Sequence, residues 1–332
     1  MKQRILNFDI LNVVACFSVV CLHCNGFVHS FIKDDWWWLR VLIEVACFFA
    51  VPVFFMLSGA TLLDYRKKYS TKTFFKKRFT RTFIPFLVWS ALFYSLSFIT
   101  KGTEGETWRE VVTNISIGKI PYTNYWFFIP LFLIYLFMPF LSLMSGSMKE
   151  KQILYLCLLL GFFQTLLPTV LYLSNIHLDM SLPFGSYVIY VFLGYYLAHS
   201  TIETDKRWMM ALGLLALLSM VGRYILVYQA SEETPEVFSY LGPYAVFPAI
   251  FIFLLFKKLF KGDKCAHPFW ESLSSKSLGV YLIHTALISV IGKAIHREEV
   301  LFIPVAIASV YLLSVVIVHI MQKNRLLRHL VP

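Results

Sequence analysis

The stretch ILNVVACFSVVCLHCNGFV, residues 10–28, decides the class of fold. It is almost wholly apolar and long enough to cross the hydrocarbon core of a bilayer, which takes about 20 residues of α-helix. Lys2 and Arg4 precede it, as in a secretory signal peptide, but no small-residue cleavage site follows. We therefore expect this stretch to be retained as a first membrane-spanning helix.

The composition of the whole chain agrees with a membrane protein. Of 332 residues, 58% are hydrophobic, 17% are aromatic and only 15% are Asp, Glu, Lys or Arg. Soluble domains carry charge on about a quarter of their residues, so this chain has too little polar surface to cover a globule in water. The composition excludes a disordered chain, a collagen, a disulfide-stapled secreted module and an ordinary soluble enzyme.

Ten apolar stretches follow one another along the chain. They predict an all-α, polytopic integral membrane protein with about ten transmembrane helices in a single domain, residues 1–332. The ends of the fifth to seventh stretches are less well defined than the others. Pro168 interrupts the stretch 152–173, and Pro183 bounds the stretch that begins at residue 184. The predicted spans are 6–29, 39–63, 82–100, 125–144, 152–173, 184–200, 207–228, 238–256, 274–293 and 300–321.

Basic residues orient these spans. Of the 30 Lys and Arg, 22 fall in loops that alternate onto one side, eight of them between Arg66 and Arg81. Because Lys and Arg accumulate in cytoplasmic loops of membrane proteins, we expect both termini in the cytoplasm. The same loops explain the net charge of +11 without a nucleic-acid partner. Membrane lipids are the expected surroundings.

The six cysteines suggest neither a disulfide framework nor a metal site. Five lie inside predicted spans, and Cys265 lies in a predicted cytoplasmic loop. Cys21 and Cys24 flank His23, but on a helix Cys21 points about 160° away from His23 and cannot share its coordination shell. We expect no metal.

A few ionisable side chains lie inside the predicted spans. Burying such a group in a bilayer costs about 2.5–3.5 kcal/mol on insertion scales, so each is a functional-site hypothesis. They are Asp9 and His23 in the first span, Glu44 in the second, Arg223 in the seventh and His284 in the ninth. Lining a transport pathway is an alternative role for Asp9, Glu44, Arg223 and His284.

The first two spans bring a histidine and a carboxylate to similar depths. Asn12, Cys16 and His23 fall on one stripe of the first helix, with Asp9 beside it, at about 100° per residue. His23 and Glu44 lie roughly 8–10 Å beneath the outer surface at about 1.5 Å per residue. A carboxylate beside an imidazole orients it as a general base. Alternatively, Glu44 pairs with Arg40, one helical turn away.

The basic segment from Arg66 to Arg81 has two interpretations. It attracts anionic lipid, or it binds a polyanionic cofactor. Arg78 and Arg81 are spaced i, i+3 just before Pro85. This spacing suits one helical face, and arginine binds phosphate through two parallel hydrogen bonds. Composition does not choose between the two.

Several strings in the correct order resemble the acyltransferase-3 family of membrane O-acyltransferases over essentially the whole chain. Two departures stand out: Asn12 occupies the position of the family's usual Arg eleven residues before the histidine, and Asn124 that of a frequent His. The matching strings are FDILN at 8–12 with VVCLH at 19–23, PVFFMLSG at 52–59, KRFTR at 77–81 followed by Pro85, YWFF at 125–128 with Pro139, FLGYYL at 192–197 and SLGVYLIH at 277–284.

The resemblance implies an activity and roles for particular residues. Family members transfer acyl groups, usually acetyl from acetyl-CoA, to hydroxyls of surface carbohydrates. His23 then corresponds to the catalytic histidine, assisted by Glu44, Asp9 and Asn12. Further expected contacts are Arg78, Arg81 and Lys77 with acyl-CoA, Ser58, Tyr281 and His284 with the oxyanion, and Trp126 and Arg223 with substrate.

The layout is most similar to stand-alone bacterial O-acetyltransferases of exopolysaccharides or antigens, including the enterobacterial common antigen type. The expected location is therefore the bacterial inner (cytoplasmic) membrane. Direct attack by the sugar hydroxyl and an acetyl-His23 intermediate both stay open. The rival functions are a transporter of a glycan intermediate or small solute, and a membrane scaffold or sensor.

Overall fold

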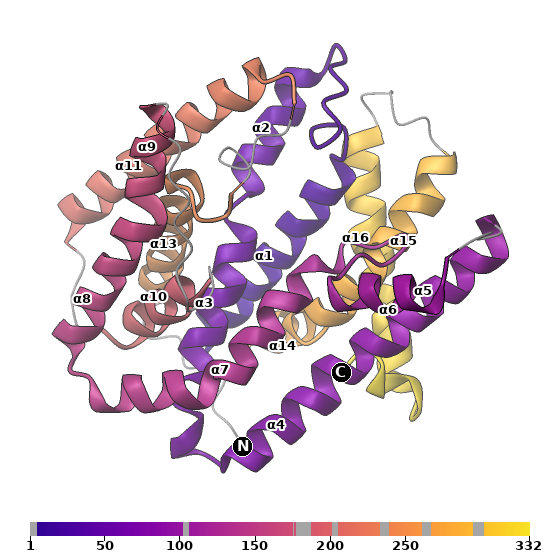
Figure 1. The fold of residues 1–332 in the computed structure, drawn as a ribbon, viewed down its shortest axis with the longest axis horizontal. Helices are drawn as coiled ribbons and strands as arrows, with labels where there is room; N and C mark the ends of the chain where they lie inside the picture. Colours follow the sequence, from indigo (N-terminus) through magenta and orange to yellow (C-terminus); the bar gives the residue numbers. More distant parts are fainter. Residues whose placement is uncertain are drawn as a thin grey trace. The chain divides into compact units, whose positions relative to one another are not determined.

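A computed structural model describes residues 5–101, 106–174, 176, 187–200, 205–232, 239–260, 267–294 and 302–332. Within these ranges every element is a helix and no strand occurs (Figure 1). Several predicted features fall outside the described residues, namely Lys2, Arg4, Pro183, Cys265 and the first residues of the spans predicted from 184, 238 and 300.

The chain divides into two compact units, each built from separated stretches of sequence. Unit 1 comprises Met1–Asp64 and Phe140–Glu271. Its helices are α1 (Leu6–Cys24), α2 (Trp37–Cys47), α3 (Ala50–Leu62), the last residues of α7 (Phe128–Ser147), α8 (Glu150–Gly161), η4 (Phe162–Leu166), α9 (Leu167–Leu173), α10 (Val188–His199), α11 (Lys206–Gln229), α13 (Pro243–Leu259) and the start of α14 (Pro268–Ser274).

Unit 2 comprises Tyr65–Pro139 and Ser272–Pro332. Its helices are η1 (Tyr65–Lys67), α4 (Thr71–Arg78), η2 (Phe79–Phe83), α5 (Ile84–Lys101), α6 (Trp108–Ser116), η3 (Tyr125–Phe127), α7 as far as Pro139, the end of α14, α15 (Ser277–Ala294), α16 (Phe302–Lys323) and η5 (Leu327–His329).

Seven helices among the described residues are long and apolar enough to cross a membrane, or eight if the bent pair α14 and α15 forms one span. Predicted spans 184–200 and 238–256 correspond to shorter helices, α10 with 12 residues and α13 with 17. The multi-pass, all-helical class is confirmed. The total of ten and the cytoplasmic termini stay predictions.

Two glycines allow a close helix crossing in unit 1, between α3 and α10. A Cβ atom added to Gly59 would clash with the backbone of Val191, and one added to Gly194 would clash with the backbone of Met56. The two glycines therefore let the helix backbones touch, as small residues do in membrane helix pairs. Both lie in the strings PVFFMLSG and FLGYYL, which gives those strings a packing role.

Hydrogen bonds join the helix ends of unit 1 into two groups. Lys257 donates to the carbonyls of Leu197 and Ser200, and Ser200 donates to Glu150, so the basic ends of α8, α10 and α13 meet. Trp37 donates to the carbonyl of Tyr228, so the start of α2 meets the end of α11. Loops predicted to share a side of the membrane thus lie together.

Two π-helical turns, η2 and η4, each end two residues before a proline. Pro85 follows η2 (Phe79–Phe83), and Pro168 follows η4 (Phe162–Leu166). Proline lacks an N–H, and its ring clashes with the carbonyl four residues earlier, here that of Arg81 or Gln164. The wider i→i+5 turn relieves this clash, and it centres on Arg81 in one helix and Gln164 in the other.

The segment between the predicted spans 82–100 and 125–144 contains helix α6 (Trp108–Ser116). Its N-terminus is a capping box: Glu110 N–H donates to the Thr107 hydroxyl, and the Thr107 N–H donates to the Glu110 carboxylate at 2.6 Å. A capping box satisfies two backbone N–H groups that a helix start leaves open. The capping-box pattern Thr107-x-x-Glu110 is visible in the sequence, and it explains why a helix forms where no membrane span was predicted.

We predict that Gly59→Ala or Gly194→Ala destabilises the protein, while Gly222→Ala does not. A methyl group at either crossing position must push two backbones apart, which costs about 1–3 kcal/mol or more. Gly222 is a helical glycine with open space around its Cβ position. Thermal unfolding of the purified protein in detergent measures the effect. Equal midpoints for the three variants would contradict the close α3–α10 contact.

Candidate functional site

The end of α1 positions His23. Thirteen of the 19 residues of α1 are buried, including the neighbours Leu22 and Cys24, whereas His23 is only partly buried. Asn25 caps the helix through its backbone N–H, and its side-chain amide donates to the carbonyl of Arg40 at 2.6 Å. The imidazole therefore lies in the last turn of a helix that is tied directly to α2.

Two contacts set the register between the antiparallel helices α1 and α2. The first is the bond from Asn25 to the Arg40 carbonyl. The second is the proximity of the thiols of Cys21 and Cys47, which interact with each other. His23 and Glu44 lie between these contacts and therefore at the same level of the two helices. A direct contact between these two side chains stays a prediction.

Glu44 is the centre of a buried charge cluster that sequence analysis did not foresee. Its Oε1 accepts from Arg223 Nη2 of α11 at 3.1 Å, and its backbone carbonyl accepts from Nη1 at 3.3 Å. Its Oε2 lies 3.5 Å from His29 Nε2. Both Glu44 and Arg223 are fully buried. The Arg223 guanidinium also lies over the Phe48 ring, 3.4 Å from its centroid.

Arg40, the alternative partner considered for Glu44, binds a different carboxylate. Its guanidinium donates to Oδ2 of Asp34 at 2.6 and 2.8 Å and to Oδ1 at 3.0 Å, and it lies over the Phe27 ring. Asp34 is six residues away in the loop before α2, so this pair fixes the loop. Arg40 and Arg223 thus hold two separate acidic groups.

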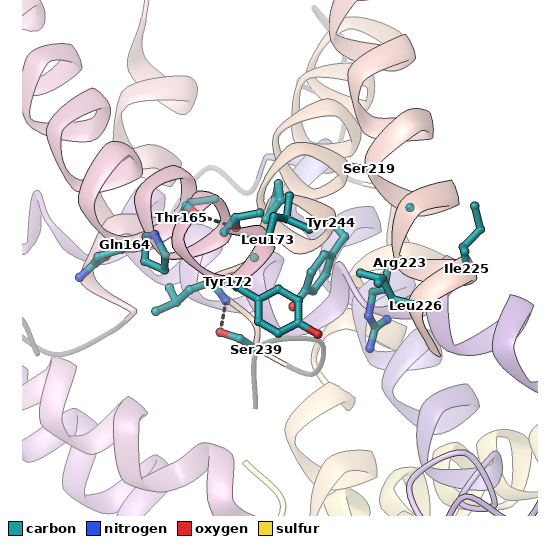
Figure 2. A pocket seen from close by; sticks show the side chains of 16 residues that line it. Gln164, Thr165, Tyr172, Leu173, Ser219, Arg223, Ile225, Leu226, Ser239 and Tyr244 are labelled. Atoms are coloured by element: carbon teal, nitrogen blue, oxygen red, sulfur yellow. Dashed lines mark hydrogen bonds between the residues drawn. The ribbon is translucent and has the colours of Figure 1, made fainter. Parts of the chain in front are cut away.

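A pocket of about 540 Å³ lies in unit 1 beside Arg223. Figure 2 shows Tyr172 and Tyr244 between the turn that carries Thr165 and the α11 turn that carries Arg223. The pocket lies at the ends of α9, α11 and α13 that are remote from Lys206 and Lys257. It is lined by Gln164, Thr165, Pro168, Thr169, Tyr172, Leu173, Ser219, Gly222, Arg223, Ile225, Leu226, Ser239, Leu241, Gly242, Pro243 and Tyr244.

Two polar atoms in the wall of this pocket lack hydrogen-bond partners. The Oε1 atom of Gln164 and the Oγ1 atom of Thr165 are buried and unpartnered, and both residues belong to η4. Leaving such an atom unpaired costs about 1–3 kcal/mol. A ligand with hydroxyl groups would satisfy both atoms, so the pocket suits a polyhydroxylated molecule better than a pure hydrocarbon.

In unit 2, the basic residues Lys77, Arg78 and Arg81 face different surroundings. Arg78 packs over the rings of Phe74 and Tyr135, and its buried Nε has no hydrogen-bond partner. Lys77 lies 3.9 Å from the Tyr69 ring centroid. Arg81 is exposed and lines a second pocket. The π turn η2 begins between Arg78 and Arg81, so the expected shared α-helical face is interrupted.

Unit 2 also holds Trp126, Tyr281 and His284 around an aromatic cluster. The Tyr281 hydroxyl donates to the Asn124 carbonyl at 2.6 Å. The buried His284 directs Nδ1 at the carbonyls of Val280 and Tyr281, so Nδ1 carries the proton. Trp126 packs edge-on against Phe127. An oxyanion contact from Tyr281 would require its hydroxyl to leave Asn124.

The remaining predicted residues lie in unit 1. Asp9 and Asn12 are partly buried on α1, as is Ser58 on α3. The Ser58 hydroxyl donates to the Phe54 carbonyl at 3.0 Å, one helical turn earlier. Unit 1 thus contains His23, Glu44, Asp9, Asn12, Ser58 and Arg223, and unit 2 contains Lys77, Arg78, Arg81, Trp126, Tyr281 and His284.

Comparison with known proteins gives one match. A family model described as an acyltransferase domain matches residues 5–319, nearly the whole chain. No curated protein and no solved structure matches. The matched range includes every candidate site residue named above.

We predict that Glu44→Gln and Arg223→Met each destabilise the protein more than both changes together. Either single change leaves one buried charge uncompensated, and breaking such a pair typically costs about 3–5 kcal/mol. The double variant removes both charges, so most of the loss should be recovered. Thermal unfolding of the four proteins gives the coupling. Additive losses would show that the two groups do not act as a pair.

Proposed function

Because the chain belongs to the acyltransferase-3 family and is therefore a membrane O-acyltransferase, we propose that it transfers acetyl from acetyl-CoA to a carbohydrate hydroxyl. The proposed acceptor is an exported or cell-surface polysaccharide, or its lipid-linked precursor, at the bacterial inner membrane. The single observation that carries this proposal is the partly accessible His23, held at the level of a buried Glu44–Arg223 pair that borders a pocket.

The proposed general base is His23. It is the histidine to which the family resemblance points, and capping by Asn25 holds its helical turn against α2. The neighbouring charge pair places a fixed dipole at the same level, and preorganised charge stabilises an imidazolium as it forms. Asp9 and Asn12 continue the polar stripe toward the other end of α1.

The proposed acceptor site is the pocket between α9 and α11. Aromatic rings of Tyr172 and Tyr244 offer apolar faces, and Gln164 and Thr165 offer unpaired polar atoms. This combination suits a sugar, which has both apolar faces and hydroxyls. Arg223 lines the pocket and binds Glu44, so one ion pair separates the pocket from the level of His23.

The chemical step we propose is direct transfer. A ring nitrogen of His23 takes the proton of the acceptor hydroxyl while the hydroxyl oxygen attacks the thioester carbonyl carbon. The carbon–sulfur bond of the tetrahedral intermediate then breaks, and the CoA sulfur leaves and takes the proton from the imidazolium. Within unit 1, Ser58 is the proposed donor to the oxyanion and Arg223 the further substrate contact. The contacts expected of Tyr281, His284 and Trp126 stay predictions of the family resemblance, because the Tyr281 hydroxyl and the His284 Nδ1–H already donate to backbone carbonyls. One such donor is commonly worth about 2.7–4 kcal/mol.

We predict that His23→Ala abolishes acetyl transfer and leaves CoA binding intact. The measurement is incorporation of radiolabelled acetyl from acetyl-CoA into glycan or glycolipid in sealed membrane vesicles. His199→Ala is the matched control, since His199 is a partly exposed histidine that contacts Asp64 at the end of α10. Turnover by His23→Ala at the wild-type rate would refute the proposed base.

This experiment also separates the enzyme from the alternative transporter. A transporter has no reason to consume acetyl-CoA, so label in glycan supports the acyltransferase. The opposite result would be no labelled product, together with a solute flux that Glu44→Gln abolishes. It would support transport by the charged residues of unit 1.

We predict that Gln164→Leu raises KM for the acceptor without lowering stability. Leucine is close to glutamine in size and removes a buried unpaired amide oxygen, so the free energy of unfolding should stay equal or rise. The pocket would lose a hydrogen-bonding group, so acceptor binding should weaken. Acceptor titration at saturating acetyl-CoA, together with thermal unfolding, tests this. An unchanged acceptor KM would exclude Gln164 from the acceptor site.

A further inference from the structure

A second pocket, of about 610 Å³, brings together parts of unit 2 that are far apart in sequence. One wall comes from the π turn η2, and the other from the end of α16 and the segment after it. This second pocket is lined by Thr80, Arg81, Gln322, Arg328, His329, Val331 and Pro332.

Basic side chains gather in this pocket. Arg81, Arg328 and His329 are all exposed and line it together. Within the described part of the chain, no Asp or Glu lies within ion-pair distance of any of the three. Cations that converge without a carboxylate raise the local concentration of anions. The pocket therefore favours an anionic ligand.

Several contacts hold the segment that carries Arg328 and His329 in place. Trp89 of α5 donates its indole N–H to the Leu330 carbonyl at 3.1 Å. Gln322 donates to the carbonyls of Val331 and Ser275, at 3.1 and 3.2 Å. Val331 is fully buried beside Gly279. The side chains of Arg328 and His329 thus project from an anchored backbone.

We propose that residues 328–329 complete, with Arg81, a binding site for the phosphate groups of the acyl-CoA donor. This inference rests on the proposed function for the identity of the donor. Arg81 was a donor contact expected from sequence, whereas Arg328 and His329 are assigned by the geometry. Coenzyme A carries a diphosphate and a separate 3′-phosphate, and the two guanidinium groups and the imidazole that line this pocket offer hydrogen-bond donors to them.

The size of the pocket supports this ligand over the other local source of phosphate, an anionic lipid headgroup. Small-molecule and cofactor pockets are typically about 300–1,000 Å³, and this one falls within that range. A glycerophospholipid headgroup brings a single phosphate, which two hydrogen-bonding cations satisfy. The His329 imidazole and the remaining volume suit a larger polyphosphate.

Coenzyme A binding to the full chain in phosphatidylcholine nanodiscs tests the proposal by calorimetry, without turnover. The double substitution Arg328→Gln, His329→Gln should raise Kd by about tenfold or more, because it removes the guanidinium and imidazole donors that would bind the phosphates. Arg325→Gln is the matched control: Arg325 is exposed on the same segment but does not line the pocket. Its Kd should stay within twofold.

The opposite results overturn the proposal. They are an unchanged Kd in the double variant, or an equal increase in Arg325→Gln, which would indicate unspecific surface charge. If the double variant keeps its coenzyme A affinity but loses bound phosphatidylglycerol in nanodiscs containing that lipid, the pocket holds lipid headgroups, and the donor assignment is wrong. Both variants change exposed side chains, so thermal midpoints should match wild type.

A second variant tests the anchoring. Trp89→Phe removes the hydrogen bond to the Leu330 carbonyl and leaves every basic side chain of the pocket in place. Coenzyme A should therefore bind more weakly, although the charge of the protein is unchanged. Wild-type affinity in this variant would contradict a preorganised site. Coenzyme A binding is independent of catalysis: intact binding without any acetyl transfer would refute the proposed function and leave the pocket assignment standing.

Discussion

Every backbone N–H and C=O group inside a bilayer needs a partner within the protein, and Pro85 and Pro168 break that pattern inside two helices. In both places the chain widens into a π turn two residues before the proline. Each π turn presents a polar residue at its centre to a pocket: Arg81 in unit 2 and Gln164 in unit 1. One local constraint of the backbone therefore shapes both candidate binding pockets.

Much of the architecture is readable from the sequence, because bilayer thickness sets the length of an apolar helix. Helix α1 and the long spans around α3, α7, α8 and α16 follow from apolar runs alone. The positions of Gly59 and Gly194 were visible as well, but that they face each other across α3 and α10 depends on residues 135 positions apart. The capping box of helix α6, formed by Thr107 and Glu110, is also recognisable in the sequence.

The site was harder to predict, since its partners come from distant helices. The depth of Glu44 follows from counting residues, whereas its ion pair with Arg223 depends on how α2 packs against α11. The i, i+3 spacing of Arg78 and Arg81 indicates one face only if the helix is regular, and η2 changes that geometry. Arg328 and His329 appeared in the sequence merely as basic residues after the last span.

In the proposed mechanism, His23 acts as a base and not as an acyl carrier. Mass spectrometry of the purified protein after exposure to acetyl-CoA, without any acceptor, distinguishes the two routes most directly. Direct transfer predicts bound coenzyme A and no acetyl group on His23. Stoichiometric acetylation of His23 that disappears when acceptor is added would contradict the account and establish an acetyl-enzyme.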